Sequence, residues 1–373
     1  MTERTMQELL QGKALGRTEI EDLVVVPLFA VVMALILGAV TMLATGVDLP
    51  TIGLSYVALL DGSVGSLNAV SETLTAAAPL ILAGLGLALG FRAGLFNIGA
   101  EGQIVIGGLA AVVTGFSFAQ LPSAVLLPLS LFAGALAGAL YASIAGYLRA
   151  ATGAHEVIST IMLNLISYRL LDYFLSLPYV QQTGRADPIS KSVPDTAELP
   201  RLLTAIDPNL RVHAGIFLVM IMVGLVYWLL FRSKLGFEFR ASGENPKAAR
   251  FAGIHSGIII VAAMATAGAL AGLAGANQVL GVLGRATPGF SAGIGFDAIA
   301  VALLGRSHPV GVVLAGLLFG ALEAGGRQMQ VDAGVSIDLI GIIQALIIVF
   351  IAAPLLVRAI FPWGFRRKKD GAS

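Results

Sequence analysis

Polar side chains recur at helical spacing inside long apolar stretches of this chain. Asn97 and Glu101 are four residues apart. Glu156, Thr160 and Asn164 repeat the same spacing farther along. Residues four apart lie on one face of a helix, so each set either lines a polar pathway between helices or forms the hydrogen bonds that fix helix packing. The candidate pathway residues are Asn97, Glu101, Gln103, Glu156, Thr160, Asn164 and Asn277.

Patterns typical of enzymes are incomplete in this sequence. His155 and Glu156 begin like the zinc-binding pattern H-E-x-x-H, but residue 159 is Ser, so the second ligand is missing. Residues 289–293 have the G-x-S-x-G form of a hydrolase, which a chain with 45 glycines produces readily by chance. There is no cysteine, and no G-x-x-x-x-G-K-[ST] phosphate-binding loop occurs. We therefore expect no catalytic residue, no metal site and no cofactor.

The composition identifies the solvent that the surface faces. Hydrophobic residues make up 57% of the 373 residues and charged residues only 12%. A soluble domain carries about 25% charged residues, so most of this surface cannot face water. The net charge of +1 excludes a strongly electrostatic partner such as nucleic acid. The composition predicts an all-α polytopic membrane protein, in which an ionisable group at membrane depth costs about 2.5–3.5 kcal/mol.

About ten segments are apolar enough to be predicted as membrane-spanning helices. A hairpin of two helices is expected within 102–148, broken near 120–123 and Pro128. In the helix at 157–177, Arg169 and Asp172 are three residues apart and can pair. The helix at 296–305 is short enough to be a half-helix. The other predicted spans are 23–45, 73–91, 213–231, 257–280, 310–326 and 337–357.

Basic residues predict the orientation, because cytoplasmic loops are enriched in Lys and Arg. The loop 232–256 and the tail 359–373 are both basic, which places them in the cytoplasm. Counting crossings back from that loop puts the N-terminal segment 1–22 in the cytoplasm as well, with a transmembrane domain at 23–358. The loops 46–72 and 178–212 then lie outside. The N-terminal segment carries five acidic and three basic residues, unlike a signal peptide, so we expect an uncleaved first helix in a bacterial-type inner membrane.

Small residues four apart predict close helix contacts. The sets are Gly86/Gly90/Gly94, Gly134/Gly138 and Gly268/Gly272. In lipid, helices associate by close backbone approach, which Gly permits. Packing inside the chain is the favoured interpretation, and contact with a second subunit is the alternative.

Two segments have the features of helix starts. Asn97-Ile-Gly is one. In the basic loop, Asn245 or Glu244 caps a helix that has Pro246 in its first turn. This short helix outside the membrane docks on a cytoplasmic partner or lies on anionic headgroups.

Four segments together carry a resemblance to a known family. Residues 91–103, FRAGLFNIGAEGQ, resemble the signature of permease subunits in the branched-chain amino acid/ribose/nucleoside class of ABC importers. Residues 155–164, HEVISTIMLN, resemble the nucleoside branch of that class. Residues 243–254 are similar to its cytoplasmic coupling segment, and 295–305 with Pro309-Val-Gly to its C-terminal pattern. The resemblance covers residues 20 to 355.

The resemblance implies a non-catalytic permease subunit that imports nucleosides by alternating access. It implies a cytoplasmic ABC ATPase, a second related permease subunit and an extracytoplasmic substrate-binding lipoprotein of the basic membrane protein type. The family fold has two related five-helix halves, and the long loop 178–212 resembles the longer subunit of a heterodimer. The coupling role carries over to Gly243, Asn245, Pro246, Ala248, Ala249 and Gly253.

Other functions remain open on the sequence alone. The same machinery could carry a simple sugar such as ribose, or another small polar metabolite such as a flavin. An ion-coupled secondary transporter would use Glu101 or Glu156 as a proton site. A scaffold for other membrane subunits is a third class.

Overall fold

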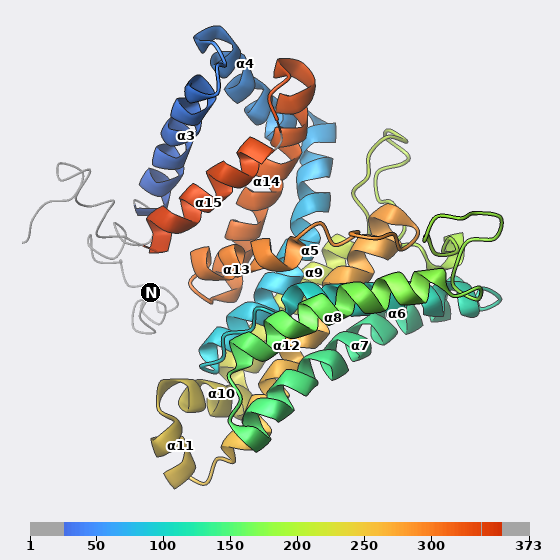
Figure 1. Cartoon of the computed structure of the whole chain (residues 1–373), viewed down its shortest axis with the longest axis vertical. Coiled ribbons are helices and arrows are strands. Elements are labelled where there is room, and N and C mark those ends of the chain that lie inside the picture. Colours follow the sequence, from blue (N-terminus) through green and yellow to red (C-terminus); the bar gives the residue numbers. More distant parts are fainter. Residues whose placement is uncertain (1–25, 337, 353–373) are drawn as a thin grey trace, which may run out of the picture. The chain divides into compact units, whose positions relative to one another are not determined.

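The computed structural model describes residues 26–336 and 338–352, and these residues form helices joined by turns and loops (Figure 1). Within them only two isolated β-bridges occur and no named strand. The described residues form two compact units, residues 63–324 and a smaller unit that joins residues 26–62 to residues 325–352. The predicted all-α class is confirmed. The segments 1–22 and 359–373, with both termini, lie outside the described residues.

The larger unit is built around α12 (Ser256–Gln278), which contacts α5, α6 and α7. Figure 1 shows α6, α7, α8 and α12 running alongside one another, with α10 and α11 at one end of the bundle. The other helices of this unit are α5 (Leu67–Arg92), α6 (Ala100–Ser117), α7 (Ser123–Thr152), α8 (Glu156–Ser176), α9 (Gly215–Arg232), α10 (Lys234–Glu244), α11 (Pro246–Phe251), α13 (Ile294–Leu304) and the first part of α14 (Pro309–Ala333).

Glycines bring α7 and α12 into backbone contact. A Cβ added at Gly138 would lie 2.3 Å from the Gly268 carbonyl oxygen, and one at Gly272 would lie 2.2 Å from that of Gly134. Real Cβ atoms do not approach this closely, so only Gly fits these positions. Both sets therefore pack inside the chain, as the favoured interpretation predicted. Gly94 differs, because it lies beyond α5 with φ +71°, and a Cβ there would lie 3.0 Å from the Gly243 Cα of α10.

The predicted spans agree with the helices apart from four corrections, the first of which is that α14 runs to Ala333, seven residues past the predicted end at 326. Among the described residues, six helices are long and apolar enough to cross a membrane: α5, α6, α7, α9, α12 with the turn after it, and α14. Pro128 lies inside α7 and does not break it, because the hairpin turns at residues 118–122 instead. The loop 46–72 contains a helix, α4 (Leu49–Leu60), and α5 begins six residues before the predicted start at 73.

The long loop 178–212 packs on the segment that follows α12. Backbone amides of Ser190, Val193 and Leu199 donate to the carbonyl oxygens of Ala286, Gly284 and Leu280, at 3.0, 2.8 and 2.9 Å. The predicted orientation places both segments outside the membrane, which is consistent with this pairing.

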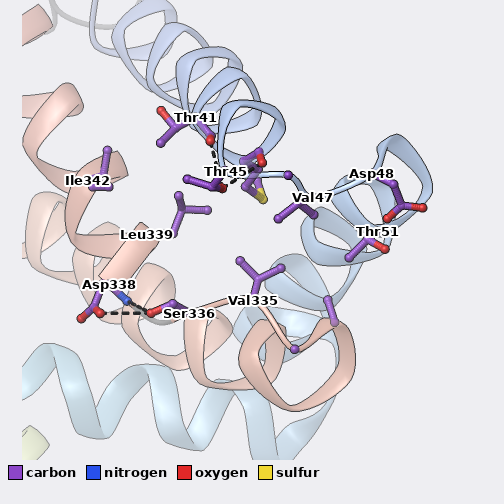
Figure 2. A pocket seen from close by; sticks show the side chains of 14 residues that line it. Thr41, Thr45, Val47, Asp48, Thr51, Val335, Ser336, Asp338, Leu339 and Ile342 are labelled. Carbon is purple, nitrogen blue, oxygen red and sulfur yellow. Dashed lines mark hydrogen bonds between the residues drawn. The ribbon is translucent and has the colours of Figure 1, made fainter.

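The smaller unit contains α3 (Val26–Ala44), α4, the end of α14 and α15 (Asp338–Ala352). A cavity of about 640 Å³ lies between the α3–α4 turn and the α14–α15 turn (Figure 2). Asp48 and Asp338 line it together with Thr41, Thr45 and Ser336. The Ser336 hydroxyl donates to Asp338 Oδ2 at 3.0 Å, which fixes the start of α15.

Candidate translocation and coupling sites

The first polar set lies at a break between two helices. Residues 93–99 are not helical, and α6 starts only at Ala100. Asn97 Oδ1 accepts from the Gly99 amide at 2.8 Å, and Asn97 Nδ2 donates to Gln103 Oε1 at 3.1 Å. The helix start expected at Asn97-Ile-Gly falls just after these residues, because α6 begins at Ala100 with Gly99 as its cap. The expectation that Asn97 and Glu101 share a helical face is wrong, because the chain bends at Gly94 and leaves Asn97 before the helix.

The second polar set fastens α8 to this break. Thr160 Oγ1 accepts from the Ile98 amide at 3.3 Å. Asn164 Oδ1 accepts from the Gly102 amide at 2.8 Å, and its Nδ2 donates to the Ile98 carbonyl at 2.9 Å. Glu156 accepts from the Phe96 amide at 3.4 Å and forms an ion pair with Arg149. The polar stripe of α8 thus satisfies peptide groups that a broken helix leaves open.

Glu101 joins the same break to a second helix start. Its carboxylate accepts from Ser291 Oγ at 2.5 Å and from the Gly295 and Gly293 amides at 2.7 and 3.3 Å. These amides belong to the start of α13, where a carboxylate is favoured by the helix dipole. The Tyr168 hydroxyl on α8 donates to the same carboxylate at 3.3 Å. Glu101 therefore ties α6, α8 and α13 together while only 1% exposed.

Asn277 is separate from this cluster. It lies at the end of α12, just before a π-helical turn at Val279–Leu283. The side chain is fully buried, and within the described part of the chain neither amide atom has a hydrogen-bond partner. A Cβ on Gly215 would lie 2.1 Å from its Nδ2. Among the candidate pathway residues, Asn277 thus has a buried amide that no described residue satisfies.

His213 lies against the same glycine and keeps its imidazole neutral. Burial, reinforced by the positive charges of Arg211 and Arg201, lowers the pKa of His213 to about 4. Its Nδ1 accepts from the Gly215 amide at 3.2 Å.

The predicted coupling segment forms two short helices. Asn245 lies between α10 and α11, and its Oδ1 accepts from the Ala248 amide at 3.0 Å, as expected for a helix cap. Pro246 occupies the first turn of α11. Ala249 is buried, and Gly253 takes a φ of +85° just after the helix. Phe251, by contrast, is 95% exposed at the end of α11.

Gly243 seats this segment directly on the end of α5. A Cβ there would lie 2.2 Å from the Arg92 carbonyl oxygen and 2.8 Å from the Gly94 nitrogen. Arg92 Nε in turn donates to the Ser307 carbonyl at 3.0 Å, in the turn between α13 and α14. The guanidinium groups of Arg92 and Arg240 lie 5.6 and 5.5 Å from the Phe231 ring centroid. The coupling segment thus contacts the helix break through one turn, residues 92–94.

His308 borders this junction from the α13–α14 turn. Burial first, and the charge of Arg92 second, lower the pKa of His308 to about 4, so the ring is neutral near pH 7.

Comparison with known proteins places the chain in a family. Residues 69–352 match the family described as branched-chain amino acid transport system / permease component. The chain belongs to this permease family. The guanosine ABC transporter permease protein NupP of Bacillus subtilis is 39% identical over 93% of this chain and 97% of its own. The nucleoside ABC transporter permease protein NupB of Lactococcus lactis is 34% identical over 91% and 93%.

A third permease relative has a different named substrate. The glucose ABC transporter permease protein TsgB13 of Haloferax volcanii is 38% identical over 87% of this chain and 86% of its own. Each of the three organisms also has a second permease protein that is similar to this chain at 28–30% identity. No solved structure was found to match.

Sequence reasoning missed several partners of the permease's polar residues. Ser291, Gly293 and Gly295 bond to Glu101, and Arg149 pairs with Glu156. A spacing signal cannot find the first three, because they lie 190 to 194 residues away from Glu101 in the chain. Arg149 is different, since the expected hairpin end at 148 and helix start at 157 already placed it near Glu156.

Proposed function

We propose that this chain is a transmembrane permease subunit of an ATP-driven importer of nucleosides. The observation that carries the proposal is the similarity to the guanosine and nucleoside permeases over nearly the full length of both chains. A simple sugar is the second candidate cargo, favoured by the glucose permease at 38% identity. The family is one of ABC permeases, which disfavours an ion-coupled secondary transporter.

The proposed assembly needs chains that supply energy and deliver cargo. The sequence has no phosphate-binding loop, so a cytoplasmic ABC ATPase supplies the energy. An extracytoplasmic lipoprotein delivers the nucleoside. A second permease completes a heterodimer, since three organisms each have one closer and one more distant relative of this chain. The proposed home is a bacterial inner membrane, with about ten spans in two related halves and both termini in the cytoplasm.

The surface proposed to meet the ATPase is the α10–α11 segment within the loop 232–256. Its coupling residues are Gly243, Asn245, Pro246, Ala248, Ala249 and Gly253. Exposed Phe251 offers an apolar contact for the partner, while Gly243 carries displacement to the turn at 92–94. ATP-driven motion of this segment would shift rigid helices and open the pathway to alternate sides.

We still propose that the candidate pathway residues line the translocation pathway, but only in a conformation that differs from the one described. Asn97, Glu101, Gln103, Glu156, Thr160 and Asn164 bond to groups within the chain in this conformation. A pathway through them therefore requires these bonds to open during the cycle. Asn277 has no such bond to break, because its amide is unsatisfied within the described residues, but its fully buried side chain still has to be exposed.

Uptake of labelled guanosine and uridine into cells with and without the gene tests the cargo. Gene-dependent uptake that excess adenosine blocks, and that ribose and glucose leave unchanged, is the expected result. Competition by glucose or ribose alone would move the cargo to sugars and keep the importer. Uptake that persists in vesicles with an ion gradient and no ATPase would overturn the ATP-driven mechanism.

A further inference from the structure

The face of α8 that points away from the helix break carries an exposed ion pair. Arg169 Nη1 lies 3.7 Å from Asp172 Oδ2, as their spacing predicted. The Arg169 side chain is 88% exposed and that of Asp172 51%. Leu165, Ile166 and Tyr173 are exposed beside them. Neither charge is covered by the other residues that the structure describes.

The position of the pair along α8 makes this exposure costly in lipid. Arg169 is the fourteenth of the 21 residues of α8. At about 1.5 Å per residue it lies about 20 Å from the helix start, inside a hydrocarbon core about 30 Å thick. Although α8 is long enough to span, it is not among the six helices apolar enough to be candidate spans. A face of this kind requires water or protein opposite it.

A recess lies at the same place. It has a volume of about 590 Å³ and is lined by Leu165, Ile166, Tyr168, Arg169 and Leu170. Pockets that bind small molecules have volumes of about 300–1,000 Å³. The volume of this recess lies within that range, so the recess is large enough for a nucleoside. Tyr168 connects the recess to the helix break, because its hydroxyl donates to Glu101.

We propose that this face of α8 lines the translocation pathway and that Arg169 and Asp172 contact the nucleoside in transit. The inference rests on the proposed function. The guanidinium fork of Arg169 matches the paired acceptors on a guanine edge, and the Asp172 carboxylate accepts from ribose hydroxyls. The exposed ring of Tyr173 offers a stacking surface for the base. A solute bound in the recess would displace Tyr168 and, through its hydrogen bond, Glu101. Glu101 bonds to the start of α13, so that helix start would move as well.

The accessibility of residue 169 to water tests the proposal directly. The chain has no cysteine, so a thiol reagent labels only the single cysteine that is introduced. Arg169→Cys in the assembled transporter should react with a charged, membrane-impermeant thiol reagent. Leu140→Cys on α7, at 62% exposure, is the lipid-facing control and should stay unreactive. Ala186→Cys in the exposed loop 178–212 is the reactive control. Excess guanosine should slow labelling of residue 169 and leave that of residue 186 unchanged.

Labelling no faster than at Leu140→Cys would overturn the proposal in favour of lipid contact. Cross-linking of residue 169 to the second permease, with no effect of guanosine, would overturn it in favour of a subunit seam. Protection by glucose and not by guanosine would overturn the nucleoside contact and the proposed cargo together. Guanosine uptake without any protection would overturn the α8 contact alone, leaving the proposed function intact.

Uptake by charge variants gives a second readout. Arg169→Leu and Asp172→Asn should each lower guanosine uptake by at least about tenfold when equal amounts of the transporter are in the membrane. A loss of this size is expected because each variant removes one charge-assisted hydrogen bond to the nucleoside. Arg169→Lys should recover part of it, since the charge returns without the fork. Unchanged uptake in Arg169→Leu would overturn the proposal, because a lipid-facing pair is dispensable.

Discussion

At the scale of single residues, Glu101 shows how a buried carboxylate is stabilised. An isolated charge at this depth would be strongly destabilising, yet Glu101 accepts hydrogen bonds from a serine, a tyrosine and two backbone amides. The amides come from the start of α13, so the helix dipole also favours the negative charge. The sequence placed Glu101 among possible pathway residues, and the structure adds a concrete task, which is to hold two helix starts together.

Glu101→Gln tests that task. A glutamine has one acceptor oxygen and an NH₂ that cannot accept, so it loses bonds to either Ser291 or Gly295. We expect the free energy of unfolding to fall by about 1.5–3 kcal/mol, the range for hydrogen bonds to a charged group. Thermal unfolding of the purified complex measures this. Glu72→Gln is the control, because Glu72 pairs with Arg211 nearer the surface, where such a pair contributes about 0–1 kcal/mol.

Uptake per folded molecule separates the two roles of Glu101. If the variant only lowers the amount of folded protein, the carboxylate fixes packing. If uptake per folded molecule also falls, the pathway hypothesis gains support. Equal stability and equal uptake would contradict both.

At the scale of elements, helix packing in this protein depends on missing side chains. α7 and α12 approach so closely that their backbones touch at Gly134, Gly138, Gly268 and Gly272. Apolar burial supplies little driving force between helices in lipid, so close backbone contact carries the association.

Gly138→Ala therefore should push α7 away from α12. The added Cβ would lie 2.3 Å from a backbone carbonyl that no rotamer change can move, and overpacking costs about 1–3 kcal/mol. Gly224→Ala on α9 is the matched control, since nothing lies within 4 Å of its Cβ, and Ala favours the helix by about 0.5–1 kcal/mol. Thermal unfolding and membrane amount should fall for the first variant only. A Gly138→Ala protein as stable as the wild type would show that the two helices do not touch there.

Much of this architecture follows from the sequence because lipid imposes simple rules. Long apolar runs and basic loops predicted α5, α9 and α12 to within a few residues, apart from the early start of α5. Cap residues predicted α11 through Asn245 and Pro246. The break at 93–99 was predicted only in part, since helical spacing wrongly kept Asn97 on the helix. The contacts of Glu101 with Ser291 and of Gly243 with Arg92 depend on tertiary folding, and no local pattern encodes them.

At the scale of the whole molecule, the proposed assembly has the permease receive its motion from a separate ATPase. The proposed receiver, α10–α11, touches the membrane helices where Gly243 meets the turn at residues 92–94. From that turn one route leads to the break and Glu101, and another leads through Arg92 to Ser307 before α14. If the contact at Gly243 is a rigid joint, displacement of α10 would move the helix break at Glu101 and the turn at Ser307 together.

Gly243→Ala tests the joint in the assembled transporter. The new Cβ would lie 2.2 Å from the Arg92 carbonyl, so α10 must shift off the turn while α11, the proposed ATPase contact, keeps its sequence. We expect the ATPase to bind and hydrolyse ATP, but nucleoside uptake per ATP hydrolysed to fall by about tenfold or more, the effect of a coupling free energy near 1.4 kcal/mol. Gly257→Ala at the start of α12 is the control, because its Cβ would meet Ala150 at an ordinary 3.7 Å. Uptake and hydrolysis measured in the same vesicles give the ratio. An unchanged ratio in Gly243→Ala would remove the joint from the mechanism, whereas loss of ATPase binding would show that Gly243 shapes the docking surface instead.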